Sequence, residues 1–181
     1  MVWRLPAPRR ARVLLSQLVY RNPPISIDRA LEVLQTLERQ SVETVLIGGW
    51  GIDALVGRQL RPHRDVDILV DEGQLELTVG ILEQIGFELW NADPEPGPIG
   101  ELPIARAITL RDGALRVVEL HAVDLGEVNP VGGTIGGMQV RCLAANHQLQ
   151  AQHKIGRTWT PQRRLNQQRN LAAVQKLLQS D

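Results

Sequence analysis

The fold is decided by one stretch of the chain, which reads Thr44-Val45-Leu46-Ile47, Gly48-Gly49-Trp50-Gly51-Ile52-Asp53 and, after a basic loop, Asp65-Val66-Asp67-Ile68. The β-branched, apolar run predicts a buried strand that stops at the two glycines. The segment from Trp50 to Val56 predicts a short helix that ends at Gly57. Residues 65–70 then predict a second strand.

The second strand carries two acids on one face. Side chains alternate along a strand, so Asp65 and Asp67 point the same way, about 7 Å apart, while Val66 points into the core. Neighbouring carboxylates repel each other and need a positive partner, which is either a divalent cation or an arginine. The arginine alternative is an ion-paired strand end formed with Arg61 or Arg64.

The glycine turn before the helix is a candidate anion site. Backbone N–H groups at such a turn can bind a phosphate, and glycines let the phosphate approach the backbone closely. Gly48 and Gly49 taken alone are also consistent with an ordinary tight turn.

A third acid interrupts the apolar strand expected at 115–123, where Glu119 and His121 share one face. A carboxylate in a central strand is costly unless it is paired or bound to a metal. If this strand lies beside the strand of Asp65 and Asp67, three carboxylates converge in the arrangement that holds two Mg²⁺ ions on a nucleoside triphosphate. The alternative is an edge strand with Glu119 and His121 in solvent.

The remaining pattern predicts an α+β fold, in which helices pack on a mixed central sheet and a helical pair closes the chain. A helix capped by Ser26 precedes the first strand, and another follows Asp71. Four more strands are expected at 87–91, 102–111, 115–123 and 138–142, and the closing helices at 144–155 and 162–179. The glycine-rich segment 132–137 is expected only to lead into the last strand.

Composition excludes several classes of protein. The 181 residues include a single cysteine, Cys142, which excludes an internal disulfide framework and favours the cytoplasm. No apolar run reaches the roughly 18 residues of a membrane helix, so no membrane partner is expected. The formal net charge of zero argues against nucleic-acid binding through a strong overall field.

Charge is distributed unevenly and suggests the organisation of the chain. Five arginines and no acid occur in residues 1–27, whereas the centre is acidic and the C-terminal end is basic. We therefore expect a basic N-terminal extension at 1–25, a core at 26–143 and a C-terminal helical segment of the same domain at 144–181. Either the basic ends dock on the acidic centre, or the centre collects cations while a basic element binds an anionic ligand.

The combined motifs resemble those of the small antibiotic nucleotidyltransferases. These are the lincosamide and aminoglycoside 2″-nucleotidyltransferases of the polymerase-β-like superfamily. The resemblance covers roughly residues 27–175. The segments that carry it are Gly48-Gly49-Trp50-Gly51-Ile52-Asp53-Ala54-Leu55-Val56-Gly57-Arg58, Arg61-Pro62-His63-Arg64-Asp65-Val66-Asp67-Ile68, Val118-Glu119-Leu120-His121 and Val140-Arg141-Cys142-Leu143, with Gln148 and His153.

The resemblance implies a polymerase-β-like nucleotidyltransferase fold and a role for each matching residue. Gly48 and Gly49 would hold the triphosphate of ATP or another nucleoside triphosphate. Asp65, Asp67 and Glu119 would be the catalytic residues that bind two Mg²⁺ ions, with Glu119 also a candidate general base. His63 and Arg64 are candidate nucleotide-binding residues, and His121 would lie beside the metal or phosphate groups.

The implied reaction moves a nucleotide, AMP when ATP is the donor, to a hydroxyl of a small-molecule acceptor such as an antibiotic. The acceptor oxygen attacks the α-phosphorus in line and pyrophosphate leaves. The resemblance also allows a homodimer, because some relatives complete the acceptor site with a second subunit.

Several positions depart from the family pattern. Glu119 stands where aspartate is usual, and Leu165 and Gln168 replace two acids of the C-terminal helices. Basic residues in this part of the chain suit a cationic aminoglycoside poorly and a neutral or anionic acceptor better. Acceptor identity is therefore open.

Two other functions are compatible with these residues. One is a minimal nucleotidyltransferase antitoxin that binds or adenylylates a helical toxin. Such proteins usually have Gly-Ser and a shorter gap than the 15 residues that separate Gly49 from Asp65 here. The other is a nucleotide-binding module that has lost catalysis, which only the altered C-terminal segment supports.

Overall fold

The computed structural model describes residues 23–154 and 161–179. The basic extension expected at 1–25 therefore lies outside the described residues up to position 22. Among the described residues, no helix combines the length and the apolar character that a membrane span requires.

The described residues form seven strands and five α-helices. The strands are β1 (Thr44–Ile47), β2 (Asp65–Asp71), β3 (Phe87–Asp93), β4 (Arg106–Asp112), β5 (Val117–Val123), β6 (Pro130–Ile135) and β7 (Met138–Leu143). The α-helices are α2 (Ile27–Arg39), α3 (Gly48–Val56), α4 (Leu75–Gln84), α5 (Ala145–Lys154) and α6 (Pro161–Leu178). Two short 3₁₀ turns, η1 (Glu72–Gln74) and η2 (Leu125–Glu127), complete the list.

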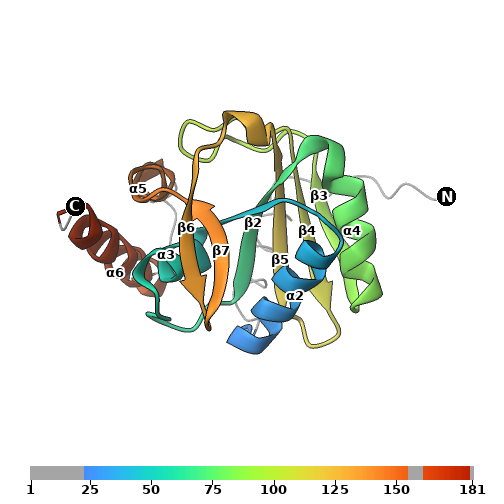
Figure 1. Ribbon diagram of the computed structural model, residues 1–181, viewed down its shortest axis with the longest axis horizontal. Coiled ribbons are helices and arrows are strands. Elements are labelled where there is room, and N and C mark those ends of the chain that lie inside the picture. Colours follow the sequence, from blue (N-terminus) through green and yellow to red (C-terminus); the bar gives the residue numbers. More distant parts are fainter. Residues whose placement is uncertain (1–22, 155–160, 180–181) are drawn as a thin grey trace.

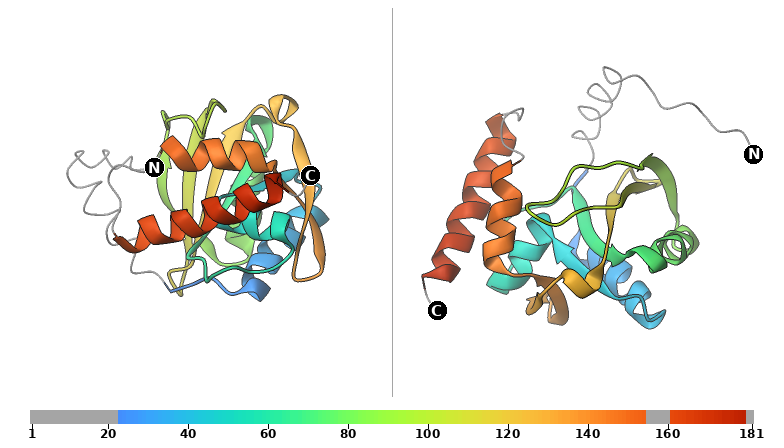
Figure 2. Two further views of the ribbon diagram at one scale, coloured as in Figure 1. Left: turned by 90° about the vertical axis from the view of Figure 1, so that its left-hand side faces the viewer. Right: turned by 90° about the horizontal axis from the view of Figure 1, so that it is seen from above.

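All seven described strands form one mixed sheet in the order β3-β4-β5-β2-β1-β7-β6. The pairs β2–β5 and β1–β7 are parallel, and the other neighbours are antiparallel. Helices α2 and α4 cover one face of the sheet, and α5 and α6 lie together beside α3 at one end of the molecule (Figures 1 and 2). The expected α+β fold with a C-terminal helical pair is confirmed.

The core lies between the sheet and helices α2 and α4. Alternate residues of the two central strands point into it, including Val66 and Ile68 of β2 and Val118 and Leu120 of β5, all fully buried. A smaller apolar cluster lies on the opposite face, where Ile104 of the β3–β4 loop packs with Leu69 and Val123. The rest of that opposite face carries the acids of β2 and β5, because side chains alternate along each strand.

The structure contains a strand that the sequence analysis missed. Residues 130–135 form β6, which pairs with β7 around a turn at Gly136 and Gly137, both with positive φ. Glycines disfavour a strand in isolation, so the glycine-rich segment did not predict one. Tertiary packing explains the glycine at 133, since a Cβ there would come within 2.8 Å of the carbonyl oxygen of Ala54 in α3.

Two helix glycines offer a matched test of this packing. Gly51 in α3 faces β1 and α5 so closely that a Cβ would lie 2.8 Å from the carbonyl oxygen of Leu46, whereas a Cβ at Gly80 in α4 would meet nothing within 4 Å. We expect Gly51→Ala to lower the free energy of unfolding by about 1–3 kcal/mol. Gly80→Ala should leave it unchanged or raise it by up to about 1 kcal/mol, because alanine is the better helix former.

Urea unfolding of the two variants and the parent protein measures both effects. Equal effects of the two substitutions would contradict the close approach of α3 to β1 and α5.

Candidate active site

Parallel pairing of β2 with β5 brings the acids of the two strands together. Asp67 lies directly opposite Glu119 in the register, and Asp65 lies opposite Val117. Residues paired across neighbouring strands share a face of the sheet, so Asp65, Asp67 and Glu119 all project from the face opposite α2 and α4. The strand that carries Glu119 is therefore central, and the edge-strand alternative is wrong.

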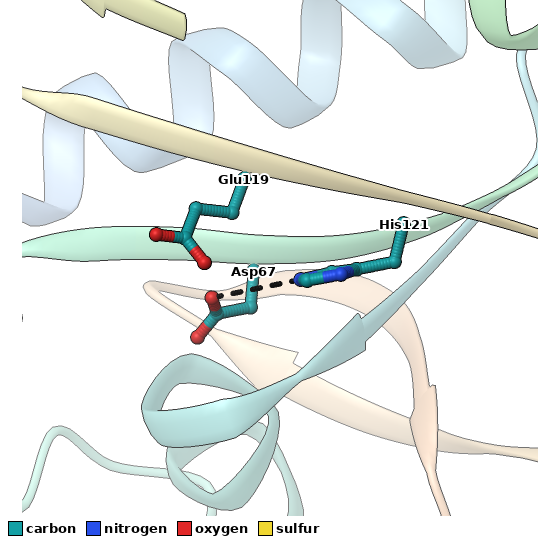
Figure 3. Close-up of side chains that lie close together, drawn as sticks. All are labelled: Asp67, Glu119 and His121. Atoms are coloured by element: carbon teal, nitrogen blue, oxygen red, sulfur yellow. Dashed lines mark ion pairs between the residues drawn. The ribbon is translucent and has the colours of Figure 1, made fainter. Parts of the chain in front are cut away.

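The side chains of Asp67, Glu119 and His121 converge on one point (Figure 3). One potential ligand atom from each lies within 4.8 Å of the other two, and Nε2 of His121 is 4.0 Å from Oδ1 of Asp67. The side chain of Asp67 keeps 21% of its surface exposed, so this group is open to solvent. Asp65 is outside this tightest trio but acts on it through its charge.

Burial raises the pKa values of all three acids, and repulsion adds to the shifts of two of them. Burial, together with repulsion from Asp67, raises the pKa of Asp65 to about 7. Burial raises the pKa of Asp67 to about 6, although Arg61 and a hydrogen bond from Glu119 oppose the shift. Burial and repulsion from both aspartates raise the pKa of Glu119 to about 8. The site therefore disfavours the charged form of each carboxyl group.

Helix α3 begins beside this carboxylate group. Gly48 has a φ of +63°, and a Cβ on it would overlap the carboxylate of Asp67. The residue before the helix is Ile47, whose side chain makes no capping hydrogen bond. The first N–H groups of α3 are thus available to an anion at the edge of the acidic site.

A buried pair connects α3 to the loop that follows it. Nε2 of His63 lies 2.5 Å from Oδ2 of Asp53, and both side chains are at most 2% exposed. Oδ1 of Asp53 accepts a hydrogen bond from the backbone N–H of Leu60. The ring of His63 packs against Trp50 and so close to Gly49 that a Cβ there would overlap it. His63 is therefore enclosed behind the glycine turn.

The two arginines of the loop occupy different environments. Arg64 is exposed, whereas Arg61 places Nη2 3.1 Å from the position of a Cβ on Gly49. Burial lowers the pKa of Arg61, and the charges of Asp65, Asp53 and Asp67 oppose this shift. Arg61, rather than Arg64, is thus the cation at the glycine turn. The sequence places Arg61 four residues before Asp65, but only the path of the loop in the structure shows that Arg61 lies beside Gly49.

Comparison with known proteins supports the resemblance inferred from the sequence. Residues 29–97 match the family model described as aminoglycoside-2″-adenylyltransferase. A lincosamide resistance protein of Staphylococcus haemolyticus is 35% identical over 69 residues, which is 38% of this chain and 43% of that protein. The chain thus matches less than half of the length of this relative.

Solved structures extend the likeness over most of the fold. The lincosamide antibiotic adenylyltransferase LnuA with lincomycin bound superimposes with a TM-score of 0.64 at 19% identity, covering 86% of this chain and 99% of LnuA. The aminoglycoside enzyme ANT(2″)-Ia in complex with adenylyl-2″-tobramycin gives 0.60 at 18% identity, covering 83% and 93%. At these identities the match shows a shared nucleotidyltransferase fold.

The raised pKa values predict an unusual pH dependence of stability. In the presence of EDTA, we expect the free energy of unfolding to fall as the pH rises from about 5 to about 8. The folded protein keeps protons on Asp65, Asp67 and Glu119 that the unfolded chain has already released near pH 4. Each extra proton held by the folded state contributes at most about 1.4 kcal/mol per pH unit, reduced by the partial exposure of the site.

The variant Glu119→Gln should flatten this slope between pH 6 and 8, because it removes the group with the highest pKa of the three. The exposed Glu83→Gln on α4 is the matched control and should keep the parent slope. Unfolding by denaturant at several pH values measures the dependence. A stability that rises over this range would show that the acids are ionised in the folded protein.

Proposed function

We propose that this chain is a Mg²⁺-dependent nucleotidyltransferase that moves a nucleotide, AMP from ATP, to a hydroxyl of a small-molecule antibiotic. Asp65, Asp67 and Glu119 form the catalytic group in this proposal, and the start of α3 with Arg61 binds the triphosphate. The use of ATP agrees with a location in the cytoplasm. The convergence of Asp67 and Glu119 at the first turn of α3 is the observation that carries the proposal.

The acidic residues suit a divalent cation. Three carboxylates share one face, and burial raises the pKa of each of them. Carboxylate oxygens are the ligands that Mg²⁺ prefers in proteins. Bound there by Asp65, Asp67 and Glu119, Mg²⁺ would neutralise charge that develops on the phosphate oxygens.

The chain's own groups account for the other needs of the reaction. The free N–H groups at Gly48 and Gly49 and the guanidinium of Arg61 would bind and orient the phosphates. Glu119 would accept the proton of the acceptor hydroxyl in its ionised form. The buried pair of His63 and Asp53 would position the loop that carries Arg61 and would not touch the nucleotide.

The comparisons favour this proposal over the antitoxin alternative. The matching family model is described as aminoglycoside-2″-adenylyltransferase, and the similar structures include a lincosamide antibiotic adenylyltransferase. A toxin partner would instead appear as a small helical protein that co-purifies with this chain. A module that has lost catalysis would bind ATP without transferring any part of it.

Pyrophosphate release tests the proposal. With ATP, Mg²⁺ and either lincomycin or tobramycin, we expect release that depends on the metal and on the acceptor. Asp67→Asn should reduce the rate by at least about 100-fold, because it removes a charged metal ligand at the reacting phosphate. The exposed Asp28→Asn in the first turn of α2 is the matched control and should retain the parent rate.

Thermal unfolding of both variants shows whether they are folded. ATP binding without pyrophosphate release on any antibiotic of a lincosamide and aminoglycoside panel would contradict transfer to an antibiotic.

A further inference from the structure

Trp90 and Arg111 form a stacked pair on the outer strands of the sheet. The guanidinium carbon of Arg111 on β4 lies 3.9 Å from the centre of the Trp90 ring on β3. The pairing of β3 with β4 shifts register between Leu89 and Asn91, which leaves Trp90 as the extra residue of a bulge. The Trp90 side chain is nevertheless 51% exposed, so part of this large aromatic surface is open to a ligand.

Arg111 is enclosed without a carboxylate partner. The residue is only 9% exposed, and its Nε and Nη2 atoms are buried without a hydrogen-bond acceptor. Within residues 23–154 and 161–179 it forms no ion pair, although Glu88 lies opposite it in the register of β3 and β4. A guanidinium in this state is costly, and an oxygen acceptor from a ligand would reduce the cost.

The pair lies on the same face as the catalytic group. Thr109 is opposite Glu119 in the register, and Arg111 follows two residues later on β4, so its side chain projects from that face. The charge of Glu119 acts on Arg111 accordingly. Across the sheet, the order is α3 beside β2, then Glu119 on β5, then Arg111 and Trp90.

This order suggests that the phosphates and the acceptor bind on opposite sides of Glu119. The phosphates are expected beside α3, and the leaving pyrophosphate departs on that side. The attacking oxygen in an in-line displacement enters opposite the leaving group. The acceptor therefore approaches over β5 and β4, where Arg111 and Trp90 lie.

We propose that Trp90 and Arg111 bind the acceptor and select one that presents a carbonyl, carboxylate or phosphate oxygen and carries little positive charge. The proposal rests on the function proposed above, because it names the acceptor class of the same site. Arg111 donates hydrogen bonds to the acceptor oxygen, and Trp90 packs against an apolar ring face. The fixed positive charge of Arg111 disfavours a polycationic aminoglycoside.

Calorimetric titration of the full chain tests this assignment, with Mg²⁺ and a non-hydrolysable ATP analogue present. The probes are lincomycin, which has an amide carbonyl and a single basic amine, and the polycation tobramycin. We expect lincomycin to bind at least about tenfold more tightly than tobramycin. Trp90→Ala and Arg111→Gln should each weaken lincomycin binding about tenfold or more and leave the affinity for the ATP analogue unchanged.

Two further variants separate ligand contact from a structural role. Trp90→Phe should restore part of the lincomycin affinity, because it retains an aromatic face. Leu89→Ala removes the exposed neighbour of Trp90 on the same strand and should have no effect on binding.

Three results would overturn the assignment. One is tobramycin binding as tight as that of lincomycin, and another is lincomycin binding that survives both Trp90→Ala and Arg111→Gln. The third is binding of the ATP analogue with neither drug bound, which rejects the acceptor class while leaving nucleotide binding intact. Failure to bind the ATP analogue at all would reject the proposed function as well.

Discussion

Parallel pairing between β2 and β5 is the constraint on which the site depends. It sets Asp67 directly opposite Glu119 on one face while Val66, Ile68, Val118 and Leu120 fill the core on the other. Burial of these apolar side chains holds the strands in this register, since a shift by one residue would put the acids into the core. The sheet therefore forces like charges together. Burial raises the pKa of all three acids, and repulsion adds to the shifts of Asp65 and Glu119.

Helix α3 brings a group that favours an anion next to a group that favours a cation. Its first turn offers N–H groups to an anion, and Gly48 lies against the carboxylate of Asp67. A ligand that combines a cation with an anion, as a metal–nucleotide complex does, would satisfy both preferences. Asp53 of the same helix holds His63 and the backbone of Leu60, so the loop that carries Arg61 is fixed to the helix whose first turn it faces.

The sequence predicted the strands of the acids and the glycine turn because each has a strong local signal. Alternation put Asp65 and Asp67 on one face, and the acidic interruption at Glu119 stood out in an apolar run. Local signals failed where tertiary contact decides. The sequence does not show that α3 packs against Gly133 of β6. It also does not show that Arg61 lies beside Gly49 or that Asp53 holds the ring of His63.

By itself, the sequence determined the elements of the fold other than β6, the pair of aspartates and the kind of chemistry that carboxylates beside a glycine turn can perform. Tertiary structure alone decided that β5 lies beside β2, that Arg61 faces Gly49 and that Arg111 stacks on Trp90 near Glu119. The physical reason is the separation along the sequence between the residues that interact. Strand alternation, capping and turn formation depend on residues a few positions apart, whereas these contacts join segments that meet only when the whole sheet closes over its core.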